Sequence, residues 1–208
     1  MQTTRIVNDF LGLVSRTIDG LDKRIIEQAA DILFEAYERG NTVYMMGNGG
    51  SASTASHFAC DLAKFTIAAG KPRFKVMGLN DNVPLVSAWT NDSGFSSIFS
   101  EQLEPWLKEG DVLIGISVHG GSGNGDAGPW SQNLGRAVAL AQERGAKVIG
   151  FSGFDGGLLG QKADICITVP AAKEPEGTAL VESVHVAVHH LLCLALKLRI
   201  AQPEPVAA

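Results

Sequence analysis

The chain has 208 residues, of which 45% are hydrophobic, and its formal net charge is −5. This length predicts one domain, expected over residues 1–208, and the lack of a Lys/Arg cluster argues against nucleic acid as a partner. No apolar run predicts a leader or a membrane span, so a cytoplasmic protein without a membrane partner is expected. The cysteines, Cys60, Cys166 and Cys193, form no CxxC pair and predict free thiols, buried for the last two.

Two amphipathic segments open the chain. Apolar residues recur at helical spacing over 4–19 and again over 22–39, where Gly40-Asn41 has the composition of a helix end. This pair precedes the first strand-like run and has no place in a simple βαβ repeat. We therefore expect residues 1–40 to form a helical pair that covers a sheet or joins a neighbouring subunit.

Strand-like and helical segments then alternate over 41–200, followed by a tail at 201–208 that is expected to be flexible. This alternation predicts an α/β fold with a parallel sheet covered by helices on both faces. The expected strands are 42–46, 74–79, 111–117, 146–151 and 164–169. The expected helices are 54–68, 94–108, 131–144, 156–162 and a long terminal helix at 177–199.

Two of the strands run into turns of glycine and serine. The first turn is Gly47-Asn48-Gly49-Gly50-Ser51, and the second runs from Ser117 through His119 to Ser122. Glycines let a backbone approach a ligand, and a following helix N-terminus offers free N–H groups to a phosphate. Ligands of parallel sheets bind at the carboxyl ends of strands, where both turns fall. Neither turn has a P-loop or dinucleotide pattern, so no nucleotide cofactor is expected.

Most of the histidines fall in two helical groups. His57 and Asp61 are four residues apart, so they share one helix face, where they can bind a metal or act as a base and its helper; a solvated carboxylate is the alternative for Asp61. The terminal helix carries a second group on one side, for which a surface or interface cluster is the alternative to a functional site. Its members are Glu182, His185, His189 and His190. Asn91-Asp92 can line a cleft or form a plain turn.

The order and spacing of these motifs resemble the sugar isomerase (SIS) domain, and within it the phosphoheptose isomerases. The resemblance rests on the GNGGS turn at 47–51, His57 to Asp61, Asn91-Asp92, the turn at 116–122, the SGFDGG segment at 152–157 and the terminal-helix group. It covers nearly the whole chain. It implies a three-layer α/β/α sandwich of flavodoxin-like type around a five-stranded parallel sheet. It also implies a homotetramer with sites at subunit boundaries.

The resemblance also implies roles for individual residues. Asp61 and His190 match the proton-transfer pair, and a divalent metal, most often zinc, is bound through positions that match His57, Asp61, Glu182 and His190. The remaining matches concern the substrate and its phosphate. They are Asn48, Gly49, Gly50, Ser51, Asn91, Asp92, Ser117, His119 and Ser122.

Several residues depart from the family pattern. Asp61 stands where the family has Glu, Glu182 where it has Gln, and His119 where it has the second serine of the phosphate turn. Phe65 replaces an expected basic residue, and residues 123–131 lengthen the loop after the second turn. The phosphate-binding parts are therefore better matched than the parts that would recognise the sugar.

The leading hypothesis is an aldose–ketose isomerase that converts sedoheptulose 7-phosphate to a heptose 7-phosphate through an enediol. Such a reaction needs a carboxylate or imidazole close to neutral pKa and a group that holds the oxyanion. The alternative is a non-catalytic SIS tetramer that binds a sugar phosphate or a protein, of the replication-initiator-binding type. A third possibility is an isomerase or epimerase of another phosphosugar.

Overall fold

The computed structural model describes residues 2–121, 131–171 and 173–202. Five strands form one fully parallel sheet in the order β2-β1-β3-β4-β5. Their bounds are β1 (Thr42–Gly47), β2 (Lys75–Gly78), β3 (Val112–Ile116), β4 (Lys147–Gly153) and β5 (Ile165–Val169). The predicted five-stranded parallel sheet is confirmed, and each strand overlaps its expected segment.

Helices cover both faces of the sheet. Side chains alternate along β1, so that Val43 and Met45 enter one core while Tyr44 and Met46 enter the other. The first core is closed by α2 (Lys23–Arg39), α3 (Gly50–Lys64) and α8 (Glu176–Ile200), and the second by η1 (Phe95–Ser97), α5 (Ser100–Leu103), α6 (Gln132–Glu143) and α7 (Gly157–Lys162). The predicted three-layer sandwich is therefore confirmed.

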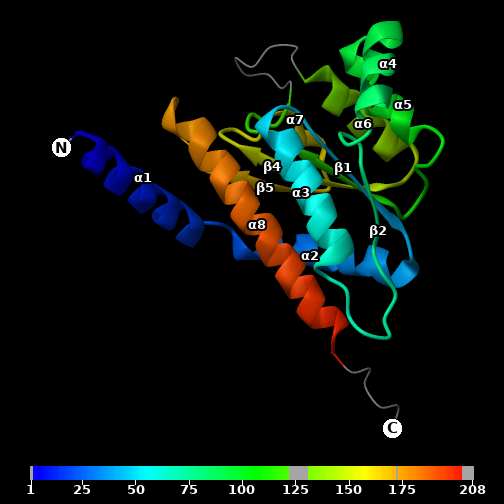
Figure 1. Ribbon diagram of the computed structural model, residues 1–208, viewed down its shortest axis with the longest axis horizontal. Helices are drawn as coiled ribbons and strands as arrows, with labels where there is room; N and C mark the ends of the chain where they lie inside the picture. Colours follow the sequence, from blue (N-terminus) through cyan, green and yellow to red (C-terminus); the bar gives the residue numbers. More distant parts are fainter. Residues whose placement is uncertain (1, 122–130, 172, 203–208) are drawn as a thin grey trace.

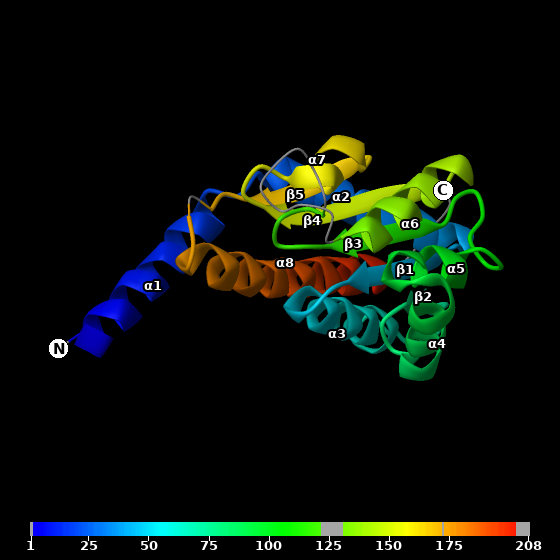
Figure 2. The same cartoon turned by 90° about the horizontal axis from the view of Figure 1, so that it is seen from above.

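The first helix, α1 (Gln2–Asp19), extends away from the sandwich, as Figures 1 and 2 show. Thr17 is its only buried residue among those that the structure describes. The apolar side chains of Ile6, Val7, Leu11 and Ile18 are exposed. Of the expected helical pair, α2 thus covers the sheet. In α1, Phe10, Leu13 and Val14 pack against the first core, whereas the four exposed residues find no cover among the residues that the structure describes.

The region between β2 and β3 differs from its prediction. The single helix expected at 94–108 is instead two short pieces, η1 and α5, and a helix that was not expected, α4 (Val83–Ser93), precedes them. The Asn82 side chain caps α4 by accepting from the backbone N of Leu85 at 3.2 Å, and Pro84 occupies its first turn. Gly94, with φ of 84°, ends it. Because this helix buries none of its residues, it lacks the periodic apolar stripe that predicts a helix.

The terminal helix α8 runs through the first core. By length and composition alone it could cross a membrane, which the sequence analysis did not anticipate, but half of its most apolar window is buried inside the protein. It packs on α1, α2 and α3, as a core helix does. The described cysteines are free: Cys193 is buried within α8 as expected, Cys166 is only partly buried, and Cys60 is exposed.

Candidate active site

The two glycine turns lie side by side at the edge of the sheet. β1 and β3 are neighbours, and their last residues, Gly47 and Ile116, are paired in register. From β1 the chain moves outward to β2 on one side, whereas β3, β4 and β5 follow on the other, so the strand order reverses between β1 and β3. Open parallel sheets bind their ligands at such a point. The expected placement of both turns at the carboxyl ends of neighbouring strands is thus confirmed.

The first turn leads directly into the N-terminus of α3. Gly49 has φ of 58°, a value that disfavours residues with a Cβ, and it precedes the first helical residue, Gly50. Ser51 follows within the first turn and is buried. The first N–H groups of a helix have no partner within it, so this end of α3 can accept an anion.

Two asparagine side chains that were not predicted from the sequence hold the first turn. The amide of Asn80 bonds to both backbone groups of Gly47: it accepts from N at 3.1 Å and donates to O at 2.9 Å. The amide of Asn133, fully buried on α6, forms a reciprocal pair with Asn48 at 2.8 and 3.1 Å. These bonds fix the turn relative to the loop after β2 and to α6.

The second turn is organised around Ser117. Its Oγ accepts from the backbone N of Gly121 at 3.0 Å, and Gly120 and Gly121 have φ of 66° and 83°. Because the oxygen is the acceptor in this bond, the hydroxyl hydrogen remains available to a ligand. Ser122 lies outside the described residues, as does most of the longer loop expected at 123–131.

The other expected phosphate contacts have partners of their own. His119 Nε2 lies 3.6 Å from Glu174 Oε1, and its ring stacks on Phe154 with centroids 4.5 Å apart. Asn91 donates to Asp92 Oδ1 at 2.7 Å, and both lie exposed near the end of α4 rather than in a turn. The structure thus pairs His119 with Glu174 and Phe154, and Asn91 with Asp92.

Three imidazoles surround the carboxylate of Asp61. Asp61 Oδ2 lies 3.4 Å from His57 Nε2 and 3.3 Å from both His189 Nε2 and His190 Nε2. One nitrogen or oxygen from each of these four residues lies within 4.8 Å of the others. The side chains of His57 and His190 are 49% and 50% exposed, that of Asp61 is 22% exposed, and that of His189 is fully buried. We call this group the His/Asp cluster.

The cluster arises because α3 and α8 lie side by side, as Figure 1 shows. Gly50 contacts Glu182 near the start of both helices, and Lys197 donates to the Phe65 carbonyl near their ends, so the two helices run parallel. His57 and Asp61 face α8 between these points. His189 and His190 therefore both reach Asp61, although they are adjacent in sequence.

Burial shapes the protonation of the cluster. The pKa of His189 is lowered to about 4, mainly by burial and to a smaller extent by the nearby His190 and His57. The hydrogen bond to Asp61 acts in the opposite direction. Burial also raises the pKa of Cys193 to about 12, with a smaller contribution from the Asp61 charge. At neutral pH His189 is thus a neutral ring, the form in which imidazole binds metals.

Glu182 stands apart from the cluster. A Cβ added to Gly50 would lie 2.8 Å from Glu182 Oε2 and closer still to Oε1. The carboxylate therefore packs against Gly50 in the first turn of α3. Of the four expected metal ligands, the structure brings together His57, Asp61 and His190 and adds His189, which the sequence analysis did not assign to the site.

His185, one turn before His189 on α8, is fully buried and bonds through Nε2 to the Ser152 carbonyl at 3.0 Å. Burial lowers its pKa to about 4, although the bond to Ser152 acts in the opposite direction. Because the ring titrates near 6.5 once unfolded, the folded state loses stability as the pH falls from 6.5 toward 4.

We expect His185 to contribute about 2 kcal/mol to the loss of stability between pH 7 and pH 5. The variant His185→Gln keeps an N–H donor toward Ser152 but does not titrate, so it should lose about that much less over the same interval. Urea unfolding of both proteins at the two pH values, with chelator present, measures the difference. An equal loss in both proteins would contradict the assignment.

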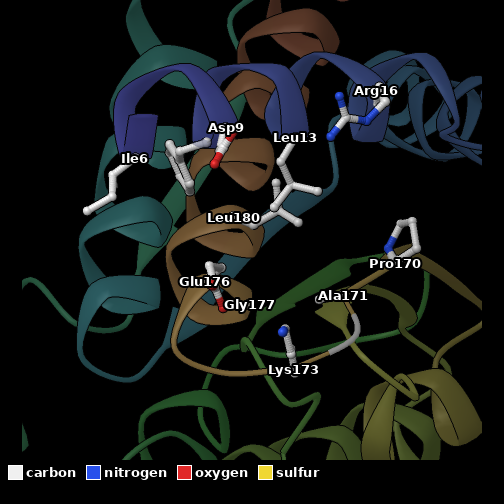
Figure 3. Close-up of a pocket in the computed structure, with 11 residues that line it drawn as sticks. Ile6, Asp9, Leu13, Arg16, Pro170, Ala171, Lys173, Glu176, Gly177 and Leu180 are labelled. Atoms are coloured by element: carbon white, nitrogen blue, oxygen red, sulfur yellow. The ribbon is translucent and has the colours of Figure 1, made fainter. Parts of the chain in front are cut away.

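Two cavities matter for function. One, of about 380 Å³, opens beside the His/Asp cluster and is lined by His57, Asp61, Phe65, His190 and Leu194. The other, of about 480 Å³, lies between α1, the segment after β5 and the start of α8, and Figure 3 shows its lining of apolar and charged side chains. The chemistry-bearing residues line the smaller cavity.

Residues 8–153 match the model of the SIS domain family, and the chain belongs to this family. It is 36% identical to the phosphoheptose isomerase of Rhodospirillum rubrum over 81% of this chain and 82% of that protein. It is 48% identical to lincomycin biosynthesis protein LmbN of Streptomyces lincolnensis over 91% of this chain and 68% of that protein. The phosphoheptose isomerase structure from Francisella tularensis superimposes with a TM-score of 0.81 at 27% identity, over 95% of this chain and 100% of that one.

Proposed function

We propose that the protein is an aldose–ketose isomerase of a phosphorylated sugar, with sedoheptulose 7-phosphate as the first candidate. The observation that carries the proposal is the carboxylate of Asp61 beside the His190 imidazole in an open cavity. Similarity to phosphoheptose isomerases in both sequence and fold supports it. LmbN, named for lincomycin biosynthesis, is also similar, so another phosphosugar is the second candidate.

The sugar phosphate would bind between the two glycine turns. Ser51 and Ser117 offer hydroxyl donors, and the N-terminus of α3 offers backbone N–H groups, so the dianion can be held without lysine or arginine. Asn48, Gly49, Gly50 and Ser122 belong to the same turns. Asn91, Asp92 and His119 stay in the proposal as contacts of the sugar or its phosphate.

Asp61 and His190 would move the protons. One removes a proton from the carbon beside the carbonyl, giving an enediol, and the other returns a proton to the neighbouring carbon. Both groups line the same cavity, so a sugar placed there reaches each of them. The buried ring of His189 lies 3.3 Å from the same oxygen of Asp61 and positions it.

A divalent metal, with zinc as the first choice, would bind at this site through His57, Asp61 and His190. For Asp61 and His190 this role competes with proton transfer, because a group bound to a metal is less free to act as a base. Two imidazoles and a carboxylate are ligands that zinc prefers, and their contacting atoms already lie within 4.8 Å of one another. When bound, such an ion supplies Lewis acidity that stabilises the oxyanion of the enediol. Glu182, the remaining expected ligand, lies along α8 toward the first glycine turn.

The protein would act as a homo-oligomer, with a tetramer as the expected form. The exposed apolar residues of α1 and the cavity beneath them offer a surface for a second copy. Leu191, Leu194 and Leu198 are likewise exposed on α8, next to the His/Asp cluster, so a neighbouring subunit there would close the site. We also propose that the protein acts in the cytoplasm.

Exchange in deuterated water tests the function. Sedoheptulose 7-phosphate is incubated with the protein as purified, after chelation, and after zinc is restored, and the sugar is followed by NMR. We expect deuterium at the carbon beside the carbonyl together with an aldoheptose phosphate, both lost on chelation. Label without aldose would point to another ketose phosphate. Binding without exchange, for every ketose phosphate tried, would contradict the isomerase and favour a non-catalytic sugar-phosphate-binding protein.

A further inference from the structure

Resting on the proposed metal-dependent isomerase, we infer that His189 is the fourth ligand of the metal site formed by His57, Asp61 and His190. Glu182 is then not a ligand. The site becomes three imidazole nitrogens and one carboxylate oxygen, drawn from two turns of α3 and two adjacent residues of α8. The oxyanion of the proposed enediol would then join the ion as a fifth ligand.

The three distances to Asp61 Oδ2 fit a tetrahedral ion. Zinc–nitrogen and zinc–oxygen bonds are about 2.0–2.1 Å, so the edges of a regular tetrahedron of ligands are about 3.3 Å long. The three edges that meet at Asp61 Oδ2 measure 3.4, 3.3 and 3.3 Å. His189 completes this pattern with the same edge length as His190.

Hydrogen bonding alone does not account for the arrangement. Three Nε2 atoms lie 3.3–3.4 Å from the single oxygen Oδ2, and only that of His189 makes a hydrogen bond to it. A cation between them would accept all three nitrogens and the oxygen together. The donor set therefore suits an ion better than a network of N–H bonds.

His189 is also held in the orientation of a ligand. Its ring is fully buried and stacks on Phe58 with centroids 5.2 Å apart and planes at 20°. Its Nδ1 faces the interior and has no hydrogen-bond partner in the part of the chain that the structure describes. Nε2 is thus the nitrogen that faces the cluster, and it needs no rearrangement to bind an ion.

Within one chain, Glu182 lies too far along α8 to share this position. It precedes His189 by two helical turns, which is about 10 Å along the axis. Its carboxylate is instead packed on Gly50 at the N-terminus of α3. Glu182 and His189 therefore make a matched pair of variants on one helix.

The test uses full-length, chelator-treated protein titrated with Co²⁺, whose visible absorption reports tetrahedral coordination. His189→Leu should weaken Co²⁺ binding by about 100-fold and change the spectrum, since even supporting residues of metal sites contribute about 10–100-fold. Glu182→Gln should leave the affinity within about twofold of the wild type and the spectrum unchanged. The reverse pattern would overturn the inference.

A second measurement uses the wild-type protein and does not depend on the folding of a variant. Pulsed EPR of the Cu²⁺ complex counts bound imidazoles, and three are expected. A count of two would overturn the inference. The ligand set and the proposed function can fail separately. Three imidazoles without sugar exchange would support the ligand set and contradict the isomerase. Sugar exchange that survives chelation, in a protein that binds no Co²⁺, would support the isomerase and contradict the metal site.

Discussion

Replacing Asp61 by asparagine is expected to lower kcat/KM for the isomerised ketose phosphate by about 1,000-fold, the size of effect that removal of a general acid or base produces. Asparagine has the same shape and can still accept from one imidazole, so the packing of α3 on α8 should persist. The negative charge among His57, His189 and His190 is lost. Steady-state kinetics together with deuterium exchange measure the effect.

Two further variants serve as controls for the loss of activity in Asp61→Asn. Asp61→Glu restores the residue typical of the family and should keep part of the activity, because a carboxylate remains at the site. Asp31→Asn removes an exposed carboxylate of α2 that pairs with Arg199, and it should leave the kinetics unchanged. If Asp61→Asn kept more than about one tenth of the activity, Asp61 could not be the proton-transfer carboxylate.

The sequence was most informative where burial and periodicity coincide. The strands of the sheet are apolar runs between turn residues, and the glycine turns at 47–51 and 117–121 follow two of them, so the fold and the place of the two turns could be predicted. The helix α4 could not be found from periodicity, since only Val86 and Trp89 are partly buried against the second core and none of its residues is fully buried. Its signal was instead local: Asn82 as a cap and Pro84 in the first turn.

The candidate site was predictable in part for the same reason. Spacing along one helix places His57 with Asp61, or His189 near His190, but it does not say which helices meet. The parallel packing of α3 and α8 decides that Asp61 faces both histidines, while Glu182 faces Gly50. The roles of Asn80 and Asn133 were likewise hidden, because each acts on a turn far away in sequence.

Gly120→Ala is expected to destabilise the fold by about 3–5 kcal/mol, the largest effect on stability that we predict. Gly120 has φ of 66°, and a Cβ there would overlap the carbonyl oxygen of Gly156 and lie 2.9 Å from Gly157 N. These are backbone atoms of the turn after β4, bound in place by the hydrogen bond from Leu159 N to Gly120 O at 2.9 Å. Neither turn can move without breaking the arrangement at the edge of the sheet.

The adjacent glycine supplies the control. Gly121 has φ of 83°, but a Cβ there would meet its nearest atom, Leu158 Cβ, at 3.7 Å, which is ordinary contact. Gly121→Ala should therefore show only the strain of the left-handed backbone, about 1–2 kcal/mol. Urea unfolding of both variants compares the two. Equal losses would mean that the turns after β3 and β4 do not touch as described, and the second phosphate turn would then lack the rigid support that a preformed anion site requires.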